Sequence, residues 1–181
     1  MTKEWRELRR EPVADCRIFT VERSISVSPH DASEHAFYRI ASGDWAQIVP
    51  ITADDEVVLV RQYRHGAARV TLEIPGGLID PGETPAAAAA RECLEETGYR
   101  AANVVSLGAV NPNPALFDNR LHSFYAQGVV RVAEIANTSS EHTEVMLVPV
   151  RELPALLSDG TIDHALVAGT LYRYLLQVRL R

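Results

Sequence analysis

The sequence predicts a mixed α+β sandwich rather than a doubly wound sheet. Short, strand-like apolar segments both precede and follow one central helical segment, and no regular strand–helix–strand repeat is present. The chain has 181 residues, which fits one domain of ordinary size. A chain of this length can bury a sizeable core unaided.

The first part of the chain is expected to be mostly strand. Residues 1–12 are polar and end at Pro12, so we expect a partly ordered arm there. Residues 13–28 alternate apolar and polar side chains, as a half-buried strand does. Residues 53–56, which are Ala-Asp-Asp-Glu, indicate a hairpin turn, and residues 75–77, which are Pro-Gly-Gly, should stop a strand. The strands predicted around these turns cover residues 35–40, 46–51, 57–60 and 70–74.

One central helix is predicted over residues 86–97. Thr84 is a suitable N-cap, and Pro85 suits the first helical position because its missing N–H would be unpaired there anyway. Gly98 is a typical terminator. After it we expect strands over residues 104–110, 122–132 and 145–150, and helices over residues 151–157 and 164–178.

Composition excludes several classes of function. The formal net charge is −6, which argues against general nucleic-acid binding, since that needs a basic face. No apolar run approaches the roughly 20 residues that span a bilayer, so we expect no membrane partner. The charged start is not expected to act as a secretory signal, and Cys16 and Cys93 are therefore expected to be free thiols in a reducing cytoplasm.

The central helix gathers like charges on one face. At about 100° per residue, with Arg91 at zero, Glu95 lies near 40°, Glu92 near 100° and Glu96 near 140°. Three carboxylates within two turns repel each other unless a cation lies among them. One reading is a solvated acidic face; the other is a site for a hard divalent cation such as Mg²⁺, with Arg91 holding Glu95 by an ion pair.

This stretch resembles the signature of the Nudix hydrolase family, G-x5-E-x7-R-E-U-x-E-E-x-G-U, where U is a bulky apolar residue. The match is carried by Gly77, Glu83, Arg91, Glu92, Glu95, Glu96 and Gly98, so that every fixed position agrees. Cys93 and Tyr99 replace the usual aliphatic residues at the two U positions. Because those are packing positions, the departure concerns core detail and not chemistry.

The resemblance implies a fold and a reaction class. It implies a mixed sheet between helices (α/β/α), with residues 45–181 as the Nudix domain and residues 1–44 as N-terminal antiparallel strands. The reaction is hydrolysis of a nucleoside diphosphate linked to another group, with Mg²⁺ or Mn²⁺ as cofactor. The family pattern assigns the metal to Glu92, Glu96 and the carbonyl of Gly76, with Glu95 sharing. Arg91 orients the glutamates, and Glu83 has a supporting part near the metal.

The flanking segments resemble the ADP-ribose pyrophosphatase and nucleoside-diphosphate-sugar branch of the family. The likeness rests on RQYR at residues 61–64, on LEIPGG at residues 72–77, on Pro114 downstream of the signature, and on SDGTIDHA at residues 158–165. It implies a small-molecule nucleoside diphosphate as substrate. Coenzyme A, oxidised nucleotides and dinucleoside polyphosphates remain alternative substrates, and a non-catalytic ADP-ribose sensor is the alternative outside the enzymes.

Charged residues near the signature are the candidates for binding the diphosphate. Arg61 and Arg64 can match phosphate oxygens bidentately; the ligand role is favoured for Arg64, whereas Arg61 is more readily a surface arginine on a strand. Glu73 could reach a metal-bound water or Arg91, or form a structural salt bridge. In this branch the general base usually lies on a loop before a late strand, where Glu141 is the first candidate and Glu144 the second.

Two further residues are candidates for contacting the substrate. Trp45 could stack on a base or belong to the core. Arg120 lies in a polar stretch that could be a substrate loop or a solvated face. Members of this branch form dimers through N-terminal strands, and the alternation in residues 13–28 suits such a contact, so we expect a homodimer.

Overall fold

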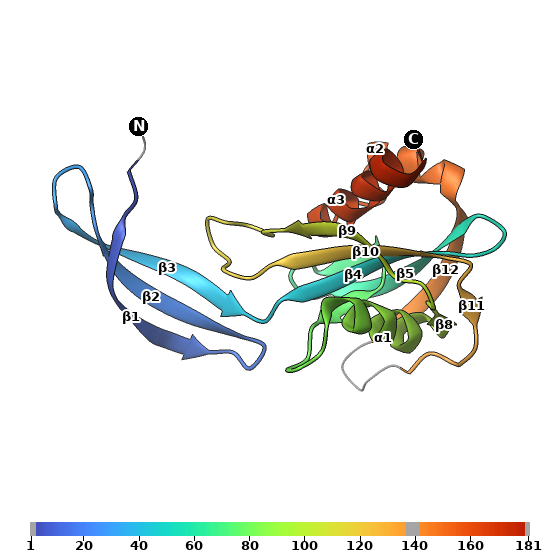
Figure 1. Cartoon of the computed structure of the whole chain (residues 1–181), viewed down its shortest axis with the longest axis horizontal. Coiled ribbons are helices and arrows are strands. Elements are labelled where there is room, and N and C mark those ends of the chain that lie inside the picture. The colour runs from blue at the N-terminus through green and yellow to red at the C-terminus, as the bar shows by residue number, and fades with distance from the viewer. Residues whose placement is uncertain (1–2, 137–141, 180–181) are drawn as a thin grey trace. The chain divides into compact units, whose positions relative to one another are not determined.

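The computed structural model describes residues 3–136 and 142–179 (Figure 1). The chain forms two compact units. The first unit comprises Met1–Asp44 and Asn111–Arg120, and the second comprises Trp45–Val110 and Leu121–Arg181.

The second unit is built on a mixed sheet with the strand order β12-β5-β4-β10-β9. β6 pairs with β5 and β7 pairs with β4 in the same sheet. β10 runs parallel to β4, whereas the other pairs are antiparallel, which confirms the predicted mixed sheet. The strands are β4 (Trp45–Ile51), β5 (Glu56–Arg64), β6 (Arg69–Glu73), β7 (Gly76–Leu78), β9 (Val105–Val110), β10 (Leu121–Gln127) and β12 (Thr143–Pro149).

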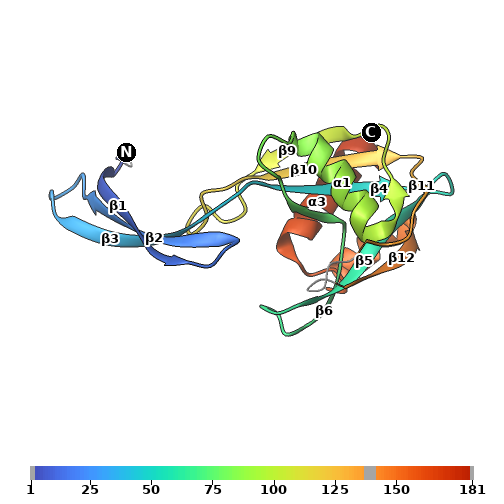
Figure 2. The same cartoon turned by 90° about the horizontal axis from the view of Figure 1, so that it is seen from below.

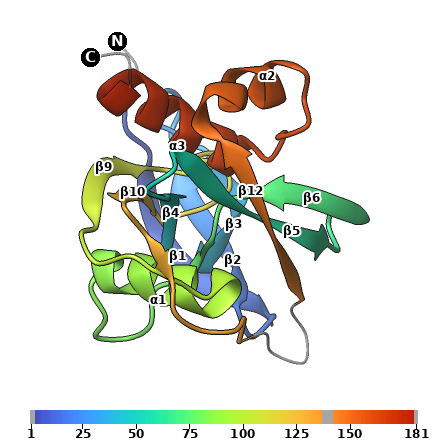
Figure 3. The same ribbon diagram turned by 90° about the vertical axis from the view of Figure 1, so that its right-hand side faces the viewer.

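Helices cover both faces of this sheet, as Figures 2 and 3 show. α1 (Pro85–Thr97) packs one face through small buried residues, Ala88, Ala89 and Cys93. α3 (Ala165–Tyr174) packs the other face through Val167, Leu171 and Tyr174. The fold is therefore α+β with a sheet between helices, as predicted. None of the helices within residues 3–136 and 142–179 is long and apolar enough to cross a membrane.

The ends of α1 follow from local chemistry. The Thr84 hydroxyl accepts a hydrogen bond from the Ala87 N–H at 3.2 Å, and Pro85 occupies the first turn. Gly98 takes a left-handed conformation with φ of 74°, and its N–H donates to the Leu94 carbonyl. This conformation is open to glycine without the steric penalty of a Cβ. The predicted helix and both of its caps are confirmed.

One predicted strand end was wrong, and one strand was not predicted. The strand before Pro75 ends at Glu73, as predicted, but a new strand, β7, begins at Gly76; it can pair with β4 because Gly76 lacks the Cβ that would collide with the backbone of Ala46 and Gln47. The single strand predicted over residues 122–132 is two strands, since Gly128 turns the chain with φ of 67°. Beyond that turn, β11 (Val130–Arg131) pairs with β8 (Tyr99–Arg100).

The C-terminal helices differ from prediction in their ends. The chain first forms a 3₁₀ turn, η1 (Val150–Glu152), and then α2 (Leu153–Ser158), where one short helix over residues 151–157 was predicted. The long helix predicted over residues 164–178 is α3 followed by a π-helical segment, η2 (Leu175–Arg179).

The first unit holds a three-stranded antiparallel sheet of β1 (Arg6–Asp15), β2 (Phe19–Val27) and β3 (Glu34–Ser42). The prediction of a partly ordered arm over residues 1–12 was wrong for the residues that form β1. The polar pattern misled because every residue of β1 is exposed, so no apolar alternation marks it. The single strand predicted over residues 13–28 is divided by a turn at Arg17, whose N–H donates to the Asp15 carboxylate at 2.9 Å.

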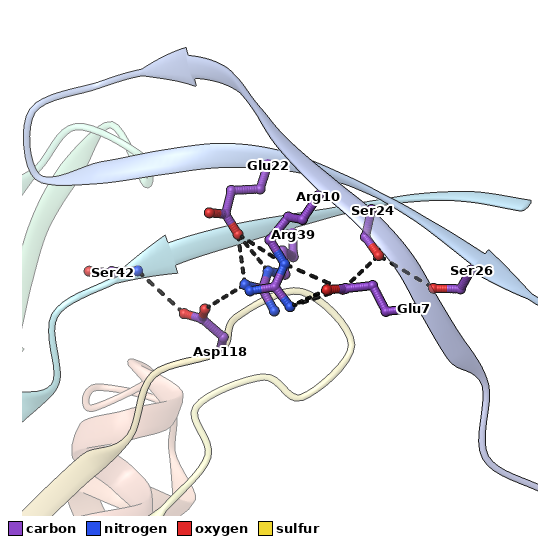
Figure 4. A network of polar contacts seen from close by, with 8 residues as sticks. All are labelled: Glu7, Arg10, Glu22, Ser24, Ser26, Arg39, Ser42 and Asp118. Carbon is purple, nitrogen blue, oxygen red and sulfur yellow. Dashed lines mark hydrogen bonds and ion pairs between the residues drawn. The ribbon is translucent and has the colours of Figure 1, made fainter.

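Polar contacts join the loop of residues 111–120 to this sheet (Figure 4). The Arg39 guanidinium lies 2.7 Å from the Glu22 carboxylate on β2 and 3.4 Å from the Asp118 carboxylate in the loop. The Ser42 N–H also donates to Asp118. The Arg39–Asp118 ion pair, the Ser42–Asp118 hydrogen bond and the backbone bonds of Ile40 with Leu116 and Asp118 therefore hold this loop against β3 although it lies far away in the sequence.

Candidate active site

The glutamates of α1 lie against the two glycines of β7. The Gly76 N–H donates to Glu96 Oε2 at 3.0 Å. A Cβ on Gly77 would fall within the space that the Glu92 carboxylate takes up, so only glycine permits this approach. Two carboxylates one helical turn apart therefore meet consecutive residues of one strand, as the predicted acidic face requires.

Arg91 binds the acidic side chains around it. Its Nη1 lies 2.8 Å from Glu92 Oε1 and 3.2 Å from Glu95 Oε2. Its Nε and Nη2 donate to the two oxygens of Glu83 at 3.1 and 3.0 Å, and Nη2 also donates to the Leu78 carbonyl. The predicted pair with Glu95 is present, although the contact with Glu92 is shorter.

These bonds fix the charge of the cluster. Hydrogen bonding to Arg91 lowers the pKa of Glu83, and the Glu83 and Glu92 carboxylates raise the pKa of Arg91 although burial opposes this. Glu83 therefore stays ionised and Arg91 stays cationic. The guanidinium offsets part of the negative charge of α1 and holds the directions of three carboxylates.

The donor set fits a hard divalent cation. Within the described ranges, no three acidic, histidine or cysteine side chains already surround a common metal position. The carboxylates of Glu92 and Glu96 nevertheless lie on adjoining residues of β7, where backbone and side-chain oxygens are the available donors. Mg²⁺ is usually held by one or two carboxylates together with waters and substrate phosphates, so two carboxylates are sufficient protein ligands.

Glu73 is the centre of a second polar cluster, and its side chain is only 1% exposed. The Arg64 guanidinium binds it bidentately, with Nε to Oε1 and Nη2 to Oε2 both at 2.7 Å. The Thr71 hydroxyl lies 2.6 Å from Oε1, and Nδ1 of His164 lies 3.1 Å from Oε2. Glu73 thus forms a salt bridge with Arg64, and its part in binding or catalysis stays a prediction.

Opposing influences act on this carboxyl. Burial is the largest single one and would raise the pKa of Glu73. Hydrogen bonds from Arg64, His164 and Thr71 together outweigh it and hold the pKa well below its ordinary value. The sequence analysis missed His164 and Thr71. Thr71 lies two residues before Glu73 on the same face of β6, so the alternation of the strand could have predicted that their side chains meet. His164 is 91 residues away from Glu73, and no local pattern predicts that contact.

Arg61 and Glu144 are neighbours across β5 and β12, and both are exposed. The adjoining Thr143 hydroxyl donates to the Glu96 carbonyl at 2.8 Å, so the Thr143 side chain faces α1. Because side chains alternate along a strand, Glu144 lies on the opposite face. Glu141 lies outside the described residues.

Trp45 and Arg120 belong to different units. Trp45 begins β4, is half-buried, and pairs with Leu78 of β7 and Leu121 of β10. Arg120 is exposed at the end of the loop of residues 111–120, where its backbone N–H donates to the Asp44 carboxylate at 2.8 Å.

Comparison with known proteins matches residues 44–168 to the NUDIX domain. The chain is 29% identical over 167 residues to the ADP compounds hydrolase NudE of Escherichia coli (strain K12), covering 91% of this chain and 88% of that protein. It is 30% identical over 122 residues to the ADP-ribose pyrophosphatase of Bacillus subtilis (strain 168), covering 67% and 66% of the two chains. A solved structure described as an ADP compounds hydrolase superposes with a TM-score of 0.87 at 26% identity, over 99% of this chain and 96% of that one.

Proposed function

The chain belongs to the Nudix family and is a hydrolase of that family, and we propose that it hydrolyses the diphosphate of ADP-ribose or a related nucleoside diphosphate sugar. The products are a nucleoside monophosphate and a sugar phosphate. The observation that carries the proposal is the placement of the Glu92 and Glu96 carboxylates against Gly76 and Gly77, with Arg91 among them. The relatives named for ADP compounds and ADP-ribose support the substrate class.

The cofactor in this proposal is Mg²⁺ or Mn²⁺. Glu92, Glu96 and the Gly76 carbonyl are its protein ligands, and Glu95 shares in holding it. When bound, such an ion neutralises diphosphate oxygens and makes water a stronger nucleophile at neutral pH. Arg91 keeps the glutamates directed towards the ligand and limits their mutual repulsion when no metal is bound.

Binding of the diphosphate is assigned first to Arg64, with Arg61 as the second candidate. Arg64 is held in place by the buried Glu73, and its own side chain is 41% exposed. A guanidinium that is fixed along one edge can bind a phosphate without first being ordered, which reduces the entropy lost on binding. Arg61 is exposed on β5 beside Glu144. Its assignment to phosphate binding therefore has less support from the geometry than that of Arg64.

The general base is assigned to Glu141, with Glu144 second. The residues on either side of residues 137–141 are bonded to the metal-binding helix: the Ala136 N–H donates to the Glu95 carbonyl at 2.8 Å, and the Thr143 hydroxyl donates to the Glu96 carbonyl. These bonds support a base in the segment between them, and Glu144 is placed second because it lies on the face of β12 opposite Thr143 and α1. The base takes a proton from the attacking water as the bridging P–O bond breaks.

Substitution of the two glutamates separates these assignments. Glu141→Gln should lower kcat by about 10² to 10⁴ while leaving Mn²⁺ affinity unchanged, and Glu144→Gln should leave kcat within about threefold. Unchanged turnover in Glu141→Gln would reject this base.

A panel of nucleoside diphosphate sugars, assayed with Mg²⁺ and then with excess chelator, tests the proposed function. ADP-ribose or a related sugar should be cleaved to a monophosphate and a sugar phosphate, and the chelator should stop the reaction. Faster cleavage of coenzyme A, an oxidised nucleotide or a dinucleoside polyphosphate would replace the substrate class. Binding of ADP-ribose without cleavage of any compound would instead indicate a sensor.

We further propose a homodimer formed through the strands of residues 1–44, with Trp45 stacking on the base and Arg120 contacting the substrate. The two free thiols, Cys16 and Cys93, suit a reducing compartment such as the cytoplasm. Light scattering at micromolar concentration should give twice the mass of the chain, and a monomer would reject the dimer.

A further inference from the structure

His164 occupies the N-cap position of α3 but does not cap the helix. Short polar side chains are favoured there because they accept a hydrogen bond from the first turn. The His164 side chain makes no such bond. Its ring reaches instead to β6, where Nδ1 lies 3.1 Å from Oε2 of Glu73. The His164 side chain therefore hydrogen-bonds a buried carboxylate on β6 instead of capping its own helix.

The bonds at Glu73 define the role of each partner. An ionised carboxylate only accepts hydrogen bonds, so Nδ1 of His164 carries the proton. Oε1 accepts from Arg64 Nε and from Thr71, and Oε2 accepts from Arg64 Nη2 and from His164. Each oxygen thus has one bond to Arg64 and one bond to another donor. Thr71 and His164 therefore fix the rotation of the carboxylate about its terminal bond.

The plane of the carboxylate sets the plane of the guanidinium. A bidentate pair keeps its two groups nearly coplanar, so a carboxylate that cannot rotate also holds the Arg64 fork in one orientation. Arg64 donates to Glu73 through Nε and Nη2, while 41% of its side chain reaches solvent. The exposed part is therefore presented in a fixed direction.

The attachment of α3 to β6 does not depend on His164 alone. The preceding residue, Asp163, forms an ion pair with Arg69 at the start of β6. That pair joins the same two elements without touching Glu73. A purely structural link between helix and strand is thus already provided by the neighbouring residue.

We propose that His164 is a positioning residue for substrate binding, which acts through Glu73 to hold the Arg64 guanidinium in the orientation that receives the diphosphate. This inference rests on the proposed function, because it takes Arg64 as the residue that binds the diphosphate. His164 itself need not touch the substrate. Its contribution is to binding, so its loss should affect KM more than kcat.

Three variants test the assignment. His164→Phe keeps a ring but removes the donor, and it should raise KM for ADP-ribose about tenfold while kcat stays within about twofold. His164→Asn offers an N–H close to the position of Nδ1 and should restore KM to within about threefold of the wild type. Asp163→Asn, which breaks only the Arg69 pair, should match the wild type. An unchanged KM in His164→Phe, or an equal rise in Asp163→Asn, would overturn the inference.

A measurement without turnover keeps this inference separate from the proposed function. The side-chain Nε–H of Arg64, identified in ¹H–¹⁵N spectra by its loss in Arg64→Lys, should exchange with solvent slowly in the wild type. In His164→Phe the exchange should be about tenfold faster, because the carboxylate that holds it can rotate. Equal exchange rates would overturn the positioning role. If the wild type cleaved no nucleoside diphosphate sugar, the proposed function would fail and this comparison would still decide the role of His164.

Discussion

Replacing the buried carboxylate of Glu73 by an amide should destabilise the fold measurably. All of the partners around Glu73 present donors: two N–H bonds of Arg64, the Thr71 hydroxyl and Nδ1 of His164. In Glu73→Gln one oxygen becomes an NH₂ group. At least one hydrogen bond to Arg64 is then lost, and the NH₂ donor faces the N–H donor of Arg64 that made this bond.

The size of the effect follows from burial. Breaking a buried ion pair typically destabilises a protein by about 3–5 kcal/mol. Arg64 and His164 are 41% and 36% exposed, so water can take over part of their hydrogen bonding. We therefore expect Glu73→Gln to lower the free energy of unfolding by about 2–3 kcal/mol at pH 7. Urea unfolding followed by circular dichroism measures it, with the exposed Glu34→Gln on β3 as a control that should stay within about 0.5 kcal/mol.

The same substitution has a predicted pH dependence. The pKa of Glu73 is lowered in the folded state, whereas an unfolded glutamate titrates near about 4.3. Its contribution to stability is therefore complete above that unfolded pKa and is lost as pH falls through it towards the folded pKa. The gap between the wild type and Glu73→Gln should narrow by about 1 kcal/mol between pH 7 and about pH 3.5. Equal stability of the two proteins at pH 7, or a gap that does not change with pH, would refute the reasoning.

Three further predictions concern α1 and the thiols. Arg91→Met should lower the free energy of unfolding by about 2 kcal/mol, because three glutamates lose their shared cation, and Mg²⁺ should stabilise this variant more than it stabilises the wild type. The control Arg131→Met, at an exposed position, should lose less than about 1 kcal/mol. Equal losses for the two variants in denaturant titrations would count against the role given to Arg91. Gly77→Ala should lower Mg²⁺-dependent activity at least about tenfold, because its Cβ displaces the Glu92 carboxylate, whereas Gly66→Ala has open space and should match the wild type; similar activities would contradict the packing argument. Burial raises the pKa of Cys93 to about 12, so a thiol reagent at pH 8 should modify only the exposed Cys16 until denaturant is added, and two fast thiols would disprove this.

Prediction from sequence succeeded where structure is determined locally. The ends of α1 were readable because Thr84, Pro85 and Gly98 act on their own turns of the helix. The shared face of Arg91 and the glutamates followed from helical periodicity alone. The layered α+β fold followed from strands that precede and follow one helix in the sequence, because the apolar faces of a sheet must be covered by another layer.

Prediction failed where the pattern carried no apolar signal or the contact was distant. The residues of β1 are all exposed, so their polar sequence gave no alternation to detect. The strand stop before Gly76 was correct, but β7 was not predicted, because glycines usually end strands, whereas here they also allow the close approach of β4 and of Glu92. The His164–Glu73 contact joins residues 91 positions apart, and nothing local to either residue indicated the other.

Binding of Mn²⁺, followed by the electron paramagnetic resonance signal of the free ion, tests most directly whether the Glu92 and Glu96 carboxylates of α1, which lie against β7, hold a metal. The wild type should remove Mn²⁺ from solution, and Glu92→Gln and Glu96→Gln should each weaken binding at least about tenfold, since each removes one of few carboxylate ligands. The exposed Glu134→Gln should bind as the wild type does. Equal Mn²⁺ affinity in all four proteins would contradict the account.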